Sequence, residues 1–474
     1  MTDKANLLAE NHIEDESSLR YMLKLAAPMV VTTISFTIMQ FVDRYMVSRL
    51  GTEALAAILP AGFASFLPSA FAIGAMASLN TFVSQSLGRG DKKSCSNYFW
   101  QTIYIGLVYF LLVVAVMWPA APWIFKLMGQ PEAVAEMEVI YFRIMLYAHI
   151  AAVINWSANQ FFMGVHRPLI TMYASLCGQI VNVGVNYVLI FGKLGFPAMG
   201  IAGAGWGTFI GISVASAINI AVFLSRDMNT VFMTRRTLQL DFSRMYDLLK
   251  VGLPAGFGLM VNVALWGMIL FALVGRFGTE ALAATSAVLS YTSLTVMPVV
   301  GIETALAAAV GKTIGAGRKD LATIQTRVCL RVALVYMGLV GISFLVFRNN
   351  LMVFWSSDED VIKIGANLLT FAAIYQVFHA ARIIYGGALR GAGDTLWLAI
   401  VSAIGAVVLG LGGLLIVHLF DELGALGPWI VATISIIAVG LANYRRFKSN
   451  RWMKIDLFKH RPISVAVEAG TVVE

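Results

Sequence analysis

The chain has 474 residues, of which 59% are hydrophobic and only 13% are charged, and its formal net charge is +8. A soluble domain usually carries about 25% charged residues, so this chain lacks the polar side chains that cover a globule in water. The composition therefore predicts an all-α polytopic membrane protein, and the three scattered cysteines indicate neither a disulfide framework nor a zinc site.

Twelve segments are long and apolar enough to cross a membrane as helices, which requires about 20 residues each. The second and the eighth are longer than a bilayer requires and contain Pro60, Pro68 and Pro298, so we expect tilt or kinks there. The predicted spans are 26–48, 54–86, 98–120, 139–161, 170–192, 201–224, 251–275, 281–311, 328–347, 365–388, 396–419 and 425–444.

Lysine and arginine are distributed unequally between the segments that join these spans. The segments after even-numbered spans, such as 87–97 and 225–250, are rich in them, whereas 420–424 carries none. Cytoplasmic loops are enriched in basic residues, so the sequence predicts a multi-pass protein of the cell (inner or plasma) membrane with both termini in the cytoplasm. The positive charge is an orientation signal, and we expect no nucleic-acid partner.

The heptapeptide GTEALAA occurs at residues 51–57 and again at 278–284, where Thr52 and Thr279 can cap the start of a helix. Prolines and glycines elsewhere in the chain recur at nearly the same spacing as the two copies of this heptapeptide. A repeat with an even number of spans enters the membrane twice in the same direction. We therefore predict two six-helix lobes related by a pseudo-two-fold axis along the membrane normal. We expect an N-terminal segment at residues 1–20, the N-lobe at 21–224 and a linker at 225–250. The C-lobe should follow at 251–446 and the tail at 447–474.

Four stretches resemble the multidrug and toxic compound extrusion (MATE) family: PMVVTTISFTIMQFVDRYMVSRLGTEALAA, SQSLGRGDKK, GLPAGFGLMVN and GGALRGAGDT. The resemblance runs from about residue 20 to residue 450. It implies twelve helices in two lobes and the export of organic cations in exchange for protons or sodium ions. The same fold group contains flippases for lipid-linked precursors, which the fold alone does not exclude.

Polar side chains within the spans of the N-lobe are candidates for the coupling site, because charged groups inside a membrane are costly and often functional. Asp43 matches the first-helix acid of the family, a proton or cation site. Gln40 lies three residues earlier on the same helix face. Two pairs of asparagines, Asn155/Asn159 and Asn182/Asn186, are each spaced by one helical turn. Asparagine side chains can relay a proton or ligate Na⁺. The alternatives are that Asp43 marks the end of a helix and that the asparagines only join helices.

The C-lobe departs from the family pattern, which has a Glu on the seventh helix and an Asp on the tenth. Asn262 and His379 occupy those positions, so both acids of that cation-coupling site are missing. Glu303 and Arg382 lie at matching depths in spans eight and ten, and we predict an ion pair between them with His379 nearby. This charged cluster either takes part in coupling or only locks the lobe.

The expected function is secondary active antiport that exports cationic, amphipathic small molecules by alternating access, coupled to inward protons through Asp43, with sodium as the variant. A flippase should show a cluster of arginines in the central cleft, and the few cations within the spans, Arg44, Arg143 and Arg382, disfavour that alternative. An enzyme or ATP-driven pump is not expected, because HExxH, GxSxG and Walker motifs are absent. We expect no cofactor or metal besides the coupling ion, organic cations and the bilayer as partners, and a monomer.

Overall fold

The computed structural model describes residues 16, 18–127, 131–264 and 270–459, and the secondary structure of this part consists of helices without a β-strand. Twelve of the described helices are long and apolar enough to cross a membrane, which confirms the predicted all-α fold. They are α2 (Leu19–Ser48), α3 (Thr52–Gly88), α4 (Lys92–Leu127), α5 (Glu132–Gly164), α6 (Pro168–Phe191), α7 (Gly200–Phe223), α9 (Phe242–Ala264), α11 (Thr279–Gly315), α12 (Lys319–Val346), α14 (Glu359–Gly391), α15 (Thr395–Leu419) and α16 (Leu426–Lys448).

Several helices are longer than the apolar runs that predicted them, because the polar residues that flank these runs are also helical. The helix α5, for example, starts at Glu132, whereas the predicted span starts at residue 139. The seventh predicted span corresponds to α9 and the short α10 (Leu270–Val274), and its residues 265–269 lie outside the described residues. Most of the predicted N-terminal segment, and the tail beyond residue 459, also lie outside them.

The repeated heptapeptide marks the start of α3 and of α11, but its glycine occupies the N-cap position. Gly51 and Gly278 have φ angles of +123° and +100°, a conformation that residues with a Cβ atom rarely adopt. Thr52 and Thr279 are the first helical residues, so the expectation that they cap the helices was wrong.

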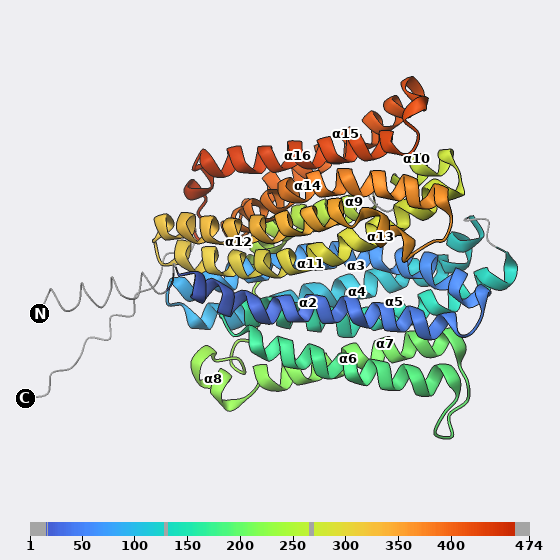
Figure 1. Ribbon diagram of the computed structural model, residues 1–474. Helices are drawn as coiled ribbons and strands as arrows, with labels where there is room; N and C mark the ends of the chain where they lie inside the picture. The colour runs from blue at the N-terminus through green and yellow to red at the C-terminus, as the bar shows by residue number, and fades with distance from the viewer. Residues whose placement is uncertain (1–15, 17, 128–130, 265–269, 460–474) are drawn as a thin grey trace, which may run out of the picture.

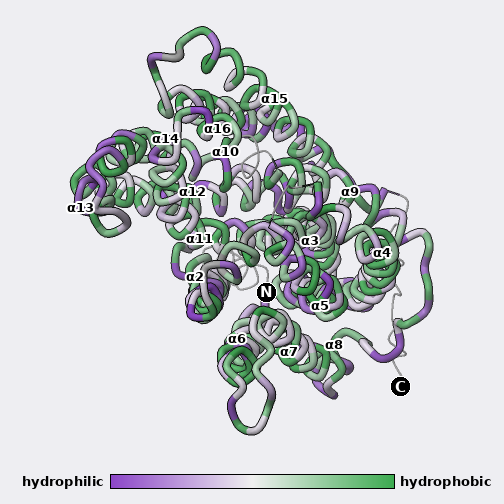
Figure 2. Tube along the Cα trace, turned by 90° about the vertical axis from the view of Figure 1, so that its right-hand side faces the viewer, coloured by the Kyte–Doolittle hydropathy of each residue, from purple (hydrophilic) through white to green (hydrophobic). Residues whose placement is uncertain are grey.

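The helices run roughly parallel to one another and form two lobes, the N-lobe (α2 to α7) and the C-lobe (α9 to α16), which occupy different sides of the bundle (Figures 1 and 2). The start of α2 and the end of α16 lie at the same end of the bundle in Figure 1, and we call this end the terminal side. The segments after α3, α7, α11 and α16, which contain many of the basic residues, also lie there.

The lobes meet through two symmetric close approaches at the terminal side. A Cβ atom on Gly88 of α3 would overlap the carbonyl oxygen of Lys312 on α11, and one on Gly315 of α11 would overlap the carbonyl oxygen of Gln85 on α3. These four residues form two repeat-related pairs, Gly88 with Gly315 and Gln85 with Lys312. The contact therefore follows the pseudo-two-fold relation that the sequence repeat predicts.

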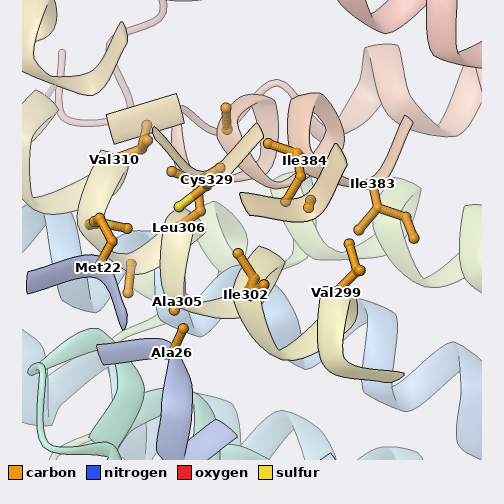
Figure 3. Packing of buried hydrophobic residues seen from close by; sticks show 14 of the residues in the cluster. Met22, Ala26, Val299, Ile302, Ala305, Leu306, Val310, Cys329, Ile383 and Ile384 are labelled. Carbon is orange, nitrogen blue, oxygen red and sulfur yellow. The ribbon is translucent and has the colours of Figure 1, made fainter. Parts of the chain in front are cut away.

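A mixed apolar core closes the terminal side of the interface (Figure 3). Met22 and Ala26 of α2 pack with Ile302 and Leu306 of α11, and Cys329 of α12 and Ile384 of α14 belong to the same cluster. Polar bonds also cross the interface: the Gln85 side chain donates to the carbonyl of Gly391 at 2.9 Å, and Thr33 donates to the carbonyl of Met297 at 3.2 Å.

Hydrogen bonds and ion pairs between the lobes, as far as the chain is described, lie between the terminal side and the middle of the bundle. At the terminal side, Glu16 pairs with Lys312 and Arg318 of the C-lobe, while the ring of Phe458 packs against Phe82 of the N-lobe. The lobes are therefore held together at the terminal side.

Candidate functional site

Asp43 is the centre of a polar cluster inside the N-lobe. It lies on α2, in the half of the helix that is remote from the terminal side, and its side chain is partly exposed. The Nδ2 atom of Asn186 on α6 donates a hydrogen bond to Oδ1 of Asp43 at 2.7 Å. A hydrogen bond to a charged acceptor is among the stronger polar contacts in proteins, so α2 and α6 are joined at this point.

The second asparagine of the predicted pair extends this cluster. Asn182 lies one turn before Asn186 on α6, and its Oδ1 atom lies 3.4 Å from Asn186 Nδ2. Its Nδ2 atom in turn donates to Oγ1 of Thr208 on α7 at 3.5 Å. Asn182 and Asn186 are fully buried, with exposed fractions of 1% and 0%, so their side chains have little freedom to exchange these partners for water.

Glycines on α7 bring the asparagine pair into position. A Cβ atom on Gly207 would overlap Oδ1 of Asn186, and one on Gly211 would lie 2.6 Å from Cβ of Asn182. The absence of side chains at these two positions lets α6 approach α7 closely. The position of both asparagines, and with it the contact of Asn186 with Asp43 on α2, therefore depends on the glycine pattern of a neighbouring helix.

Sequence analysis missed two residues of α5, of which Tyr141 lies near Asp43. Tyr141 is buried and within electrostatic range of Asp43 and Arg44. Glu138 lies one turn earlier on the same helix, is 0% exposed, and has no hydrogen-bond partner on either carboxylate oxygen. Glu138 fell one residue outside the predicted span, and a more generous helix boundary would have identified it.

The remaining N-lobe candidates do not join Asp43. Gln40 lies on the same helix face and is partly buried, but the described structure contains no hydrogen bond between its side chain and Asp43. Asn159 lies 18 residues after Tyr141 on α5, which corresponds to about 27 Å along the helix axis. Its neighbour Asn155 accepts a hydrogen bond from Asn219 of α7 at 3.0 Å, which is a helix-to-helix contact.

The predicted ion pair between Glu303 and Arg382 in the C-lobe was wrong. Glu303 of α11 instead accepts a hydrogen bond from Nη1 of Arg390 on α14 at 2.5 Å. Arg382 donates from Nη2 to Nε2 of His379, one turn earlier on α14, at 2.8 Å. Arg382 remains within electrostatic range of Glu303. Helix periodicity explains the error, because Arg382 and Arg390 are two turns apart on the same face of α14.

Asn262 of α9 and Arg382 line a common cavity of about 20 Å³ inside the C-lobe. The cavity is lined by residues of α9, α14, α15 and α16, and Ser402 and Ser435 also contribute to its wall. Asn262 thus lies in one region with Arg382 and with its hydrogen-bond partner His379, and the ionised group that faces the cavity is a guanidinium. A cation is repelled by such a group, so this region is unsuited to sodium.

The two lobes therefore differ in their polar chemistry. The N-lobe cluster offers carboxylate and amide oxygens, which can bind a proton or a small cation. The described residues contain no group of three or more His, Cys, Asp and Glu side chains arranged to hold a metal ion. The N-lobe cluster around Asp43, Asn186 and Asn182 is the candidate coupling site.

A family model described as MatE matches the chain twice, at residues 28–188 and 254–414, and these two matches coincide with the two repeats. A probable multidrug resistance protein NorM of Chromobacterium violaceum is 30% identical over 448 residues, which cover 92% of this chain and 93% of that protein. A protein of the same name from Mesorhizobium japonicum is 28% identical and covers 92% of this chain and 94% of its own.

Two solved structures share the fold. A MATE crystal structure in complex with MaL6 has a TM-score of 0.84 at 20% identity, covering 94% of this chain and 99% of that chain. An outward-facing multidrug resistance MATE family transporter of the MOP superfamily has a TM-score of 0.84 at 19% identity, covering 93% and 97%. At these identities the likeness concerns the fold alone.

Proposed function

Because the chain belongs to the MatE family, a family of transporters rather than enzymes, we propose that it is a secondary active antiporter which exports cationic, amphipathic small molecules in exchange for protons. The curated relatives are named as probable multidrug resistance proteins, which supports small organic molecules as substrates. The observation that carries the proton-coupled mechanism is the hydrogen bond of 2.7 Å between Asn186 and Asp43.

The terminal side is the cytoplasmic side in this proposal. Its segments contain most of the lysines and arginines between the spans, which is typical of cytoplasmic loops. The lobes are joined between this side and the middle of the bundle. We therefore interpret the conformation as closed to the cytoplasm, as an outward-facing exporter must be when it releases its substrate.

Antiport follows if a proton and an organic cation exclude each other at Asp43. The carboxylate is partly exposed, so an organic cation can approach it, while its partner Asn186 is buried. Protonation removes the negative charge that attracts the cation and weakens the bond from Asn186. The protonation state of Asp43 then alters both substrate affinity and the link between α2 and α6, which couples the proton to the movement of helices.

Sodium is the second candidate for the coupling ion, and one observation favours it. Oδ1 of Asn186 is buried without a hydrogen-bond partner, although its amide group contacts Asp43. Oδ1 faces Gly207 of α7 in this conformation, so the amide must rotate before its oxygen and the carboxylate of Asp43 form a suitable pair of ligands for Na⁺. Sodium coupling would use the same cluster, so the experiment must separate the two ions.

Uptake of a fluorescent organic cation into everted membrane vesicles tests the proposal. We expect an imposed pH gradient to drive uptake, Asp43→Asn to abolish it, and Glu53→Gln, which changes an exposed carboxylate, to leave it unchanged. Uptake driven only by a sodium gradient would replace the proton by Na⁺. An Asp43→Asn variant that retains proton-driven uptake would refute Asp43 as the coupling residue. No cation uptake under either gradient would favour the flippase alternative.

A further inference from the structure

The interior of the C-lobe contains more positive than negative charge. Arg382 and Arg390 are both close to Glu303, but the carboxylate forms its ion pair with Arg390. Guanidinium groups remain protonated in proteins, so two positive charges share one negative charge. Among the described residues, Glu303 is the carboxylate with which Arg382 interacts. The cluster therefore has a net charge of about +1.

The histidine beside Arg382 does not compensate this charge. Nη2 of Arg382 donates a hydrogen bond to Nε2 of His379 at 2.8 Å, which requires a lone pair on that nitrogen. His379 is therefore neutral here and serves as an acceptor. Nε of Arg382 is buried and has no hydrogen-bond partner, so the guanidinium retains a free donor inside the lobe.

A small cavity lies next to this guanidinium. It has a volume of about 20 Å³, and its wall includes the hydrogen-bond donors Asn262 of α9, Arg382 of α14 and Ser402 of α15. Such a volume exceeds the roughly 10–15 Å³ that one water molecule requires, but it is too small for an organic anion. The cavity thus combines a net positive charge, several donors and the size of a single small ligand.

We propose that this cavity binds a chloride ion, which balances the charge of Arg382 and receives hydrogen bonds from the guanidinium, Asn262 and Ser402. A buried charge without a partner is strongly unfavourable, and a bound anion removes this penalty. The ion bridges α9, α14 and α15, so it stabilises the folded C-lobe. The site is separate from the Asp43 cluster of the N-lobe, and the proposal does not depend on the proposed transport mechanism.

Thermal unfolding of the purified full-length protein in detergent tests this site. Chloride is titrated against gluconate, an organic anion too large for the cavity, at constant ionic strength. We expect the unfolding midpoint of the wild type to rise by a few degrees and to saturate with chloride, because a ligand that binds the folded state stabilises it. Bromide should act like chloride. Equal midpoints in chloride and gluconate would overturn the proposal.

Variants locate the effect. Arg382→Met should have the same midpoint in chloride and in gluconate, whereas Arg331→Met, at an exposed position on α12, should respond like the wild type. If Arg382→Met does not fold, Ser402→Ala provides the test, because it removes one donor and should raise the half-saturating chloride concentration. If the chloride response of Arg382→Met equals that of the wild type, any bound ion lies elsewhere and this site is refuted. If Arg382→Met does not fold, an unchanged response of Ser402→Ala has the same meaning.

Discussion

Replacement of Gly207 by alanine should impair proton-driven transport, although Gly207 carries no polar group. Gly207 on α7 faces Asn186, and the added methyl group would overlap Oδ1 of that residue. Asn186 must then rotate or α6 must move away, and either change lengthens the bond of 2.7 Å to Asp43. A hydrogen bond to a charged group contributes about 1.5–3 kcal/mol. A loss of this size corresponds to a roughly 10- to 100-fold change, since about 1.4 kcal/mol is a factor of ten.

The assay compares initial rates of organic-cation uptake under a pH gradient, normalised to the amount of protein in the membrane. Gly184→Ala is the matched control, because Gly184 lies on α6 beside Asn186 and a Cβ atom there meets open space. We expect Gly207→Ala to lose at least about 90% of the uptake rate, which corresponds to the lower end of the hydrogen-bond contribution. Gly184→Ala should keep the uptake rate of the wild type.

A double-mutant cycle decides whether the effect acts through Asn186. If it does, Gly207→Ala combined with Asn186→Ala should be no slower than Asn186→Ala alone, because the second substitution has nothing left to disturb. Normal transport by Gly207→Ala, or effects that multiply in the double variant, would refute the reasoning that the glycine positions the amide.

Two further predictions concern the closed terminal side, measured by the distance between spin labels on the two lobes. Gly315→Ala places a methyl group against a backbone carbonyl of α3, so it should open this side and lengthen the distances between the labels. Gly338→Ala, whose methyl group meets open space, should leave the distances unchanged. Unchanged distances in Gly315→Ala would contradict the close approach. Burial, aided by the Lys312 ammonium and opposed by Glu16, lowers the pKa of His166 to about 4, so the closed form holds a neutral ring. Opening returns the pKa toward about 6.5, so closure is favoured above this pH and weakens toward pH 4 by up to about 1.4 kcal/mol per unit. Opening at pH 5.5 that persists in His166→Gln would exclude this residue as its cause.

Sequence reasoning identified the features that depend on local pattern. Twelve apolar runs fixed the number of spans, and the repeat of GTEALAA predicted the symmetry that Gly88 and Gly315 display at the interface. Asn182 and Asn186 were recognisable because two polar residues one turn apart on an apolar helix define a face. Their contact with Asp43 depends on how α2 packs against α6, which the pattern of either helix alone does not contain.

Choices between equivalent partners required the structure. Glu303 had two arginines on the same face of α14, and the packing of α11 against α14 brings the carboxylate to Arg390 rather than to Arg382. Glu138 was missed because hydropathy places helix ends only within a few residues, whereas α5 continues for two turns beyond the apolar run. These errors share a cause. Which side chains meet between two helices depends on the rotation of each helix about its axis and on its depth in the bundle.

The central claim is that a proton and an organic cation exclude each other at Asp43. The most direct test adds an organic cation to purified protein in weakly buffered detergent solution and records proton release with a pH indicator. The account predicts release of up to about one proton per wild-type molecule, none from Asp43→Asn, and normal release from Glu53→Gln. Binding of the cation without proton release from the wild type, or release that Asp43→Asn leaves unchanged, would contradict it.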